Sequence, residues 1–485
     1  PTEMERMAKS YFQEVYTKDP TLVPGKVLDC ITAKVTEEMN ESLCQPYTEK
    51  EISDALFQIG PLKAPGTDGF PTRFYQRNWA VFKEQIIAAV QEFFITGDMP
   101  DGINDTSIVL IPKVPHPKEL KDFRPISLYN VVYKIVSKCM VNRLRPLLSE
   151  LISENQSAFI PGRLITDNSI IAFECIHHIQ TLSENSEAYC AYKLDLSKAY
   201  DRVDCNYLRQ TMQKLDFAHR WVDWIMSCVT SVRYSVKFNG VILDSFAPTR
   251  GLRQGDPLSP FLFLFVADGL SALLRQGVES HAVQPVKICS RAPGISHLLF
   301  ADDSLLLFRA SEQQSTIVKG LLSTYARATG QLINPSKCSI LFSGNCSEVV
   351  SVEVKCILEI TSEAFEPKYR GLPVPEGRMH MGRFETTQER VKKRLIDWSE
   401  QFMSSGNKEI LIKSVAHAIP IYSMSCFKLP RGLCEHINSL IRKFWWGSKE
   451  GKRKPSWSLG AQCHNRNIVE AWVFVTLNFS TSLSS

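Results

Sequence analysis

Three aspartates stand where their spacing could support chemistry. Asp302 and Asp303 are adjacent and lie between two apolar runs, and Asp195 follows the β-rich run YCAYKL. A carboxylate pair on a turn can simply be solvated. If the strands are neighbours, however, the three carboxylates meet and need cations to offset their repulsion. Oxygen-rich sites suit Mg²⁺, and two such ions stabilise the attacking and leaving oxygens of phosphoryl transfer.

A loop rich in glycine and proline lies between the two acidic segments in chain order. It has the sequence GLRQGDPLSP at residues 251–260 and leads into an apolar run at 258–274. The run predicts a buried helix. An ordinary helix start would explain the composition of the loop but not its position between the acidic segments.

The elements around these segments can be read from periodicity and turn chemistry. We expect strands at 106–111 and 188–196, helices at 128–148 and 201–215, and hairpins at 233–243 and 297–308. Asn239-Gly240 predicts the turn of the first hairpin, and Asp302-Asp303 stand at the tip of the second. Thr48 and Glu51 form a capping-box pattern at the start of a helix. Interleaved strands and helices of this kind indicate an α+β fold with helices on one face of a sheet.

The order of the motifs gives a specific resemblance. DLSKAYD at 195–201, RQGDPLSP at 253–260 and FADD at 300–303 resemble motifs A, B and C of the reverse transcriptase domain of plant non-LTR (LINE-type) retrotransposons. The flanking segments that resemble the same family are Lys113 with FRPISL at 123–128, QSAFIPGR at 156–163, NPSK at 334–337 and YRGLP at 369–373. The resemblance covers nearly all of residues 53–447.

The resemblance implies a role for each matching position. Asp195, Asp302 and Asp303 would hold two Mg²⁺ ions, for which Mn²⁺ could substitute. Lys113 and Arg124 would neutralise the triphosphate, and Gln254 and Gly255 would line the nucleotide pocket. Lys337 would protonate the pyrophosphate leaving group. These roles supply what phosphoryl transfer needs. The alternative for Lys337 is a solvated lysine.

Tyr200 bears on the choice of substrate. In the family the residue five positions after the first aspartate lies beside the nucleotide sugar, and a bulky ring there leaves no room for a ribose 2′-OH. Tyr200 therefore favours deoxynucleotides. The alternative is a tyrosine packed at the start of a helix.

The implied architecture is a right-hand polymerase with an antiparallel palm sheet backed by helices. We expect an N-terminal helical extension at 1–60, fingers and palm at 61–375, a helical thumb at 376–447 and a poorly ordered tail at 448–485. Arg370 and Asn407 depart from the family pattern. From about Ser458 the resemblance stops, and a neighbouring reading frame could encode the family-like peptide Gly-Gly-Leu-Gly-Phe-Arg-Asp. The tail is thus interpreted as a frameshift product, and the chain as a fragment that lacks the family's endonuclease and downstream domains.

Composition sets weaker limits. The chain has 485 residues, 44% hydrophobic and 22% charged, with a net charge of +5, so the positions of its cations matter more than their sum. Its 14 cysteines show no zinc-type spacing and are interpreted as free thiols of an intracellular protein. We expect no membrane span, since the strongest apolar candidate, residues 261–267, is too short.

The function that we expect is RNA-directed DNA polymerisation, with an RNA template, a DNA primer and dNTPs as partners, in the nucleus. A catalytically silent nucleic-acid-binding relic is the main alternative. An RNA-templated RNA polymerase is disfavoured by Tyr200 and Ala301. Six basic residues on predicted helices are expected to contact phosphates and to make binding salt-dependent: Lys134, Lys138, Arg143, Arg145, Lys408 and Lys413.

Overall fold

The protein is described by a computed structural model that covers residues 3–375, 381–399, 403–446, 448–449 and 452–453. It divides into two compact units. The first contains Pro1–Ile165 and Ile179–Phe365, and the second contains Thr166–His178 and Glu366–Ser485. The expected borders of fingers, palm and thumb at residues 60, 375 and 447 stay predictions.

The central sheet of the first unit has four antiparallel strands in the order β6-β7-β3-β8. Their bounds are Tyr189–Leu194 (β3), His297–Phe300 (β6), Asp303–Arg309 (β7) and Ser339–Phe342 (β8). Apart from Asp303 and Arg309 at its ends, β7 is buried throughout, which fits a short apolar strand covered on both faces. The strand at 188–196 and the hairpin at 297–308 are therefore confirmed.

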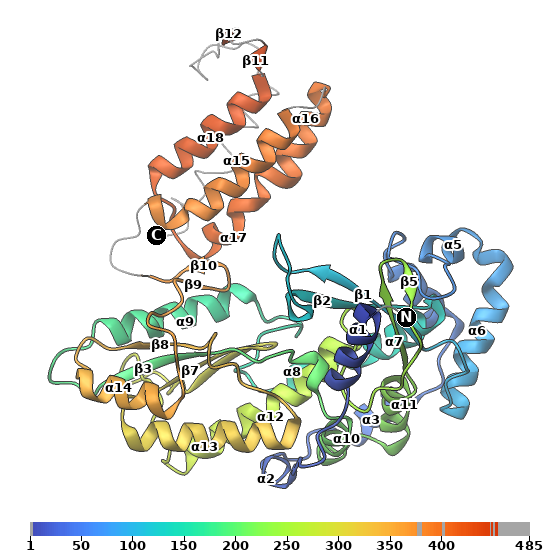
Figure 1. The fold of residues 1–485 in the computed structure, drawn as a ribbon, viewed down its shortest axis with the longest axis horizontal. Helices are drawn as coiled ribbons and strands as arrows, with labels where there is room; N and C mark the ends of the chain where they lie inside the picture. Colours follow the sequence, from blue (N-terminus) through green and yellow to red (C-terminus); the bar gives the residue numbers. More distant parts are fainter. Residues whose placement is uncertain (1–2, 376–380, 400–402, 447, 450–451, 454–485) are drawn as a thin grey trace. The chain divides into compact units, whose positions relative to one another are not determined.

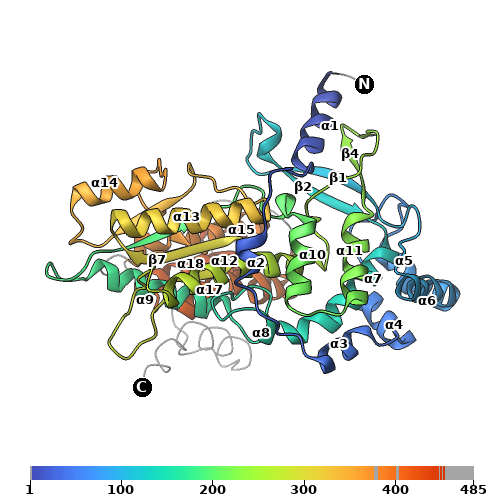
Figure 2. The same ribbon diagram turned by 90° about the horizontal axis from the view of Figure 1, so that it is seen from below.

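Two long helices run along one face of this sheet, α12 (Ser259–Glu279) and α13 (Glu312–Thr329) (Figures 1 and 2). Pro260 lies in the first turn of α12, where its missing N–H costs no helical hydrogen bond. Among the described helices, α12 alone is long and apolar enough to cross a membrane, which corrects the expectation that no segment would be. In an 18-residue stretch of α12, 72% of the residues are buried inside the protein.

A second sheet has the order β2-β1-β4-β5. Its strands are β1 (Asp105–Pro112), β2 (Phe123–Tyr129), β4 (Arg233–Phe238) and β5 (Val241–Ile242). Strand β1 is antiparallel to β2 but parallel to β4, while β4 and β5 form the predicted hairpin. Asn239 and Gly240 take φ values of 47° and 86°, the left-handed conformation of a two-residue hairpin turn.

The N-terminal helix α1 (Glu3–Val15) packs against β4. Phe12 and Tyr16 are buried with Ile108, Tyr234 and their neighbours in a small apolar cluster. This cluster joins the first residues of the chain to the second sheet.

The helices at the other end of the unit follow the predicted patterns with one shift. Helix α4 (Glu49–Gln58) begins with the expected capping box, in which the Thr48 side chain accepts from the backbone N–H of Glu51. The helix expected at 128–148 is α7 (Val131–Leu144), because Leu128 belongs to β2. The described helices not yet named in this unit are α2 (Gly25–Leu28), α3 (Glu37–Cys44), α5 (Thr72–Arg77), α6 (Trp79–Thr96), η1 (Leu120–Asp122), η2 (Arg145–Leu147), α8 (Leu148–Leu151), η3 (Tyr200–Arg202), α10 (Cys205–Lys214), α11 (His219–Thr230) and α14 (Glu348–Ile357).

The second unit is mainly helical. Its elements are part of α9 (Ile165–Gln180), β9 (Lys368–Tyr369), β10 (Leu372–Pro373), η4 (Met381–Phe384), α15 (Glu385–Ser399), α16 (Ser405–Leu411), the π-helical η5 (Ile412–Ala416), α17 (Ala418–Cys426), α18 (Arg431–Trp446), β11 (Ser448–Lys449) and β12 (Lys452–Arg453). Val391, Leu433 and Ile437 lie in its apolar core. Most of the interpreted frameshift tail lies outside the described residues. The cysteines of the described chain are free thiols.

Candidate active site

The register of the central sheet brings the acidic segments together. In the β3–β7 pair Leu194 lies opposite Ser304, so the next position along β3, Asp195, comes opposite Asp303. Phe300 pairs with Asp303 across the β6–β7 hairpin, which leaves Ala301 and Asp302 as its two-residue turn. The two acidic segments, which are far apart in sequence, thus end at the same edge of one sheet.

The Gln156 side chain holds the turn that carries Asp302 by a hydrogen bond to its backbone. Ala301 has φ 54°, a left-handed conformation that a non-glycine residue rarely adopts, and its N–H donates to Gln156 Oε1 at 2.9 Å. The same oxygen accepts from the Ala158 N–H at 3.0 Å. The sequence places Gln156 in the family-like segment QSAFIPGR but gives no sign of this contact, because only the folded chain brings residue 156 to the hairpin.

The electrostatics of Asp195 reflect its surroundings. Partial burial raises the pKa of this carboxyl group, and the nearby Asp303 adds to that effect. Lys337 and a hydrogen bond from Asn334 act in the opposite direction. The Asn334 N–H also donates to the Asp195 carbonyl oxygen at 2.9 Å, which ties the NPSK segment to the end of β3. Lys337 is therefore close enough to Asp195 to influence its charge.

The carboxylates supply the right atoms for Mg²⁺, since hard divalent cations prefer oxygen ligands. Asp302 and Asp303 are exposed, and Asp195 is half-buried. In the side-chain positions of this structure, however, no group of three His, Cys, Asp or Glu residues in the described chain is arranged to hold a metal ion. The donor chemistry fits the expected metal, and the side chains would have to turn toward one another to bind it.

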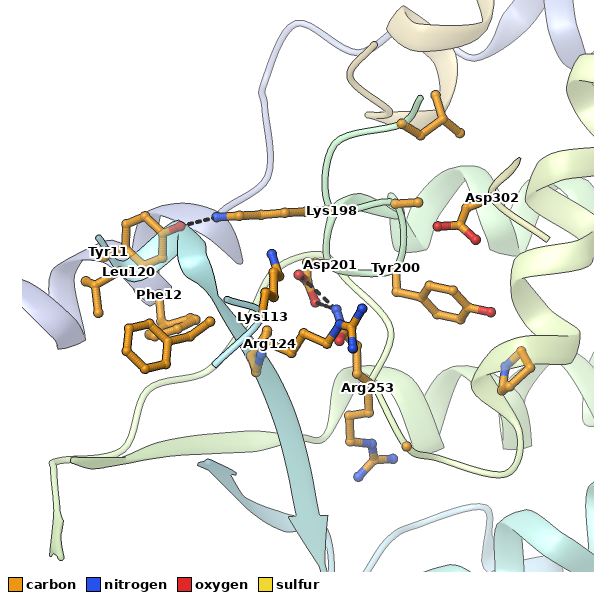
Figure 3. A pocket seen from close by; sticks show the side chains of 17 residues that line it. Tyr11, Phe12, Lys113, Leu120, Arg124, Lys198, Tyr200, Asp201, Arg253 and Asp302 are labelled. Atoms are coloured by element: carbon orange, nitrogen blue, oxygen red, sulfur yellow. Dashed lines mark hydrogen bonds between the residues drawn. The ribbon is translucent and has the colours of Figure 1, made fainter. Parts of the chain in front are cut away.

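A cavity of about 390 Å³ opens beside the Asp302 turn (Figure 3). All five residues that the sequence predicts for nucleotide binding line it, together with Asp302: Lys113, Arg124, Tyr200, Gln254 and Gly255. They come from the end of β1, from β2, from η3 and from the loop before α12. Asp195, Asp303 and Lys337 do not line this cavity.

The loop before α12 is fixed to the second sheet by its backbone. The Gln254 carbonyl oxygen accepts from the Ser127 N–H at 3.1 Å, and the Gly255 carbonyl oxygen accepts from the Tyr129 hydroxyl at 2.7 Å. Gly255 has φ 105°, which an L side chain rarely adopts. The glycine thus allows the loop to place its backbone at the cavity wall.

Tyr200 forms another part of the wall. Its ring stacks on Phe263 of α12 with the centroids 4.7 Å apart and an interplanar angle of 19°. Burial raises the pKa of its hydroxyl group, and the Asp302 carboxylate adds to the shift. The ring is held by packing on one face and lies on the Asp302 side of the cavity (Figure 3).

Three polar residues at this cavity, Asp201, Lys198 and Tyr11, have no role assigned from the sequence. Asp201 is 1% exposed and accepts from the Tyr16 hydroxyl at 3.0 Å and from Gln254 Nε2 at 3.2 Å. Burial raises the pKa of its carboxyl group to about 6. Lys198 and Tyr11 also line the wall. Lys198 and Asp201 stand in the quoted Lys-Ala-Tyr-Asp sequence, which was a usable signal, whereas nothing local points to Tyr11.

Two of the basic residues expected on a phosphate-binding face lie inside the protein. Lys134 is 7% exposed, and its amine donates to the Ala64 carbonyl oxygen at 2.7 Å. The Arg143 guanidinium donates to the Glu51 carboxylate at 2.8 Å and also to carbonyl oxygens before α4. The expectation of phosphate contacts is wrong for both, because the Lys134 amine bonds to the segment between α4 and α5, and the Arg143 guanidinium bonds to α4 and to the residues before it.

The other candidates differ in their availability. Arg145 is exposed and Lys138 is half-buried. In the second unit Lys408 donates to the Trp445 carbonyl oxygen at 3.2 Å, and Lys413 pairs with Glu409 at 2.7 Å. Lys138 and Arg145 are therefore the better candidates for a phosphate-contacting role.

Comparison with known proteins shows the family to which these features belong. The profile described as "Reverse transcriptase (RNA-dependent DNA polymerase)" matches residues 111–380, more than half of the chain. The chain belongs to the reverse transcriptase family. The matched range includes each of the nine predicted site residues, while the N-terminal helix with Tyr11 and Tyr16 lies upstream of it.

Two of the relatives of this reverse transcriptase are proteins of mobile elements. It is 28% identical over 456 residues to the transposon TX1 uncharacterized 149 kDa protein of Xenopus laevis, covering 93% of this chain and 34% of that protein. It is 24% identical over 330 residues to the Pol polyprotein of the type-2 retrotransposable element R2DM of Drosophila melanogaster, covering 68% of this chain and 29% of that protein. An uncharacterized mitochondrial protein of Arabidopsis thaliana is 46% identical over 66 residues, covering 14% of this chain and 54% of that protein.

The chain thus carries a reverse transcriptase domain of the kind found in non-LTR retrotransposons. It spans about a third of the length of the first two relatives. The mixed helical and antiparallel-sheet structure agrees with the polymerase palm that the family implies. The family generally uses Mg²⁺ and acts on nucleic-acid template, primer and dNTPs.

Proposed function

We propose that this chain is an RNA-directed DNA polymerase that adds dNTPs to the 3′-OH of a primer. The observation that carries the proposal is the cavity, because five residues from separate segments of the chain line it beside Asp302. Two of them, Lys113 and Arg124, are cations suited to a triphosphate. The chain belongs to a family of such polymerases, which supports the same reaction.

In this proposal Asp195, Asp302 and Asp303 hold two Mg²⁺ ions, with Mn²⁺ as a possible substitute. The register that brings Asp195 opposite Asp303 supports it. Bound metal would neutralise the charge that develops during phosphoryl transfer. Lys113 and Arg124 bind the triphosphate, and Lys337, which influences Asp195, gives a proton to the leaving pyrophosphate.

The remaining residues select the nucleotide. Gln254 and Gly255 line the nucleotide pocket, and the Tyr200 ring excludes a 2′-OH. The stacking of Tyr200 on Phe263 supports this role, since a ring packed on one face cannot easily move aside. A pocket closed in this way takes dNTPs in preference to rNTPs.

The architecture and setting are part of the proposal. We assign fingers and palm to residues 61–375, a helical thumb to 376–447 and an N-terminal extension to 1–60. An RNA template and a DNA primer are the proposed partners, and the nucleus the proposed site of action. The match to an Arabidopsis protein supports a plant element as the source.

A primer-extension assay tests the function. The purified chain is incubated with an RNA template, a DNA primer, dNTPs and Mg²⁺, and the Asp303→Asn variant serves as the control. We expect extension by the unaltered chain and a loss of about a hundredfold or more in the variant, because a metal-binding charge is removed. Template binding without any extension would instead identify a silent nucleic-acid-binding relic.

A further inference from the structure

The side of the cavity away from Asp302 carries a lysine that none of the assigned roles uses. Lys198 is half-buried, has φ 52° and donates from Nζ to the Tyr11 hydroxyl oxygen at 2.6 Å. Its ammonium group lies 4.2 Å from the centroid of the same ring. Figure 3 shows Lys198 reaching toward Tyr11 of α1, with Lys113 and Arg124 nearby and Tyr200 on the opposite side.

The charges around the cavity leave this ammonium group able to take an anionic ligand. A lysine has three N–H donors, and Tyr11, the neutral partner, accepts one of them. Asp201, the nearest carboxylate of the motif, already accepts from Tyr16 and Gln254. Lys113 and Arg124 line the same cavity as Lys198. Arg253, the fourth cationic residue of the lining, is buried and pairs with Asp256, which leaves these three for the predicted triphosphate.

We propose that Lys198 binds the triphosphate of the incoming nucleotide as a third cation, and that Tyr11 is the positioning residue that holds its side chain at the cavity wall. The proposal deepens the proposed polymerase function and rests on it. A left-handed backbone at Lys198 is costly for a non-glycine residue, so the surrounding structure must hold it. That backbone directs the side chain along the wall toward α1.

The local environment makes the charge of Lys198 sensitive to pH near neutrality. The pKa of its amine is lowered to about 8, mainly by burial; the cations Arg202 and Lys113 act in the same direction, and Asp201 and Glu14 oppose the shift. Lys198 is thus protonated below about pH 8 and loses its charge above it. A bound triphosphate stabilises the charged form, so binding and protonation favour each other.

Tyr11 gives the proposal a consequence that the family match alone does not contain. Helix α1 lies upstream of the matched residues 111–380, yet it supplies one side of the cavity. Nucleotide affinity should therefore depend on a segment outside the residues that match the reverse transcriptase family.

The first test compares steady-state extension by Lys198→Met and Lys198→Arg on one template-primer, with dTTP varied. We expect Lys198→Met to raise KM for dTTP about tenfold or more, with a much smaller change in kcat, and Lys198→Arg to retain most of the affinity. Lys319→Met is the matched control, because it also removes one lysine, but Lys319 pairs with Glu359 and does not line the cavity. An unchanged KM in Lys198→Met overturns the proposal. Equal impairment of Lys198→Met and Lys198→Arg also overturns it, provided that both variants unfold at the same temperature as the unaltered chain.

The second test uses pH in a Lys113→Arg background, which removes the titration of Lys113. The KM for dTTP is measured between pH 7 and 9.5. With Lys198 the KM should rise once the pH exceeds about 8, whereas with Lys198→Arg, which keeps its charge, the KM should stay level. Tyr11→Phe should move the rise to lower pH, since it removes the hydroxyl acceptor of the ammonium group. A pH profile that is the same with Lys and Arg at residue 198 contradicts the role.

A binding measurement separates this proposal from the proposed function. Binding of dTTP to the complex with template and a 3′-dideoxy-terminated primer is measured by equilibrium dialysis, so that no turnover is needed. Weaker binding by Lys198→Met than by the unaltered chain supports the role even if the chain extends no primer. Equal binding by both, or absence of dTTP binding by the unaltered chain, refutes it.

Discussion

Replacing Gln156 by Met should weaken both the fold and the reaction, because one side-chain oxygen serves two backbone donors. Gln156 is fully buried, and its Oε1 accepts from the N–H groups of Ala158 and Ala301 at 3.0 and 2.9 Å. Methionine has a similar length but lacks a strong acceptor. The substitution therefore leaves both N–H groups buried without their partner and loosens the turn that carries Asp302.

The size of the effect follows from these contacts. A buried N–H group without a partner costs about 1–3 kcal/mol, so two cost about 2–6 kcal/mol. Gln156 Nε2 is itself buried without a hydrogen-bond partner in the described part of the chain, and its removal returns about 1–3 kcal/mol. The net loss in the free energy of unfolding should be about 1–3 kcal/mol, or roughly 1–4 °C in Tm for a unit of this size.

Urea denaturation followed by circular dichroism measures the stability, and primer extension measures kcat. Gln91→Met is the matched control, because Gln91 also uses its side-chain amide, donating through Nε2 to the Tyr47 carbonyl oxygen, but it lies in α6, far from the Asp302 turn in sequence. We expect kcat to fall only in Gln156→Met. Stability and kcat within error of the unaltered chain would refute the reasoning that Gln156 supports the turn.

Three further outcomes are expected. Tyr200→Val should admit rNTPs and raise their kcat/KM relative to dNTPs by about tenfold or more, since the ring stacked on Phe263 is the proposed barrier; unchanged discrimination in an active variant contradicts this. Asp201 has a raised pKa of about 6, so the folded chain holds a proton that the unfolded chain releases near pH 4, and stability falls as pH rises from about 4 to 6. Asp201→Asn should remove up to about 3 kcal/mol of this loss of stability, as measured by urea denaturation across this pH range. If the variant shows the same dependence of stability on pH as the unaltered chain, the raised pKa of Asp201 is not its cause. Nucleic-acid affinity should fall with salt, and neutralising Lys138 or Arg145 should each reduce the slope of log K against log salt by about one; salt-independent binding would exclude phosphate contacts.

The local features of the fold were accessible from the sequence. Asn239-Gly240 indicates its hairpin because few residues adopt two successive left-handed conformations, and the structure has that turn. The Asp302 turn is predictable for a related reason, since apolar runs on both sides leave the carboxylates at the strand ends. The ordered motifs then supply the five cavity residues, which the fold assembles around one space.

What sequence reasoning could not supply depends on contacts between distant segments. The sequence predicts a phosphate contact for Lys134, but its long side chain lies inside and its amine reaches the Ala64 carbonyl oxygen, an arrangement that periodicity does not distinguish from solvation. The parallel pairing of β1 with β4 joins strands separated by α7 to α11 and leaves no local pattern. The approach of Tyr11 and Tyr16 to the cavity is equally non-local.

The docking of α1 has a consequence for the synthesis of the protein. Tyr16 bonds to Asp201, 185 residues away, and the Val15 carbonyl oxygen accepts from Arg250, 235 residues away. A ribosome that adds about 5–20 residues per second needs on the order of 10–50 s to make that stretch. During this time α1 lacks its partners Asp201 and Arg250, and its apolar residues Phe12 and Tyr16 stay accessible to chaperones and to other nascent chains. The nucleotide cavity is then completed only when α1 meets a segment that is synthesised much later.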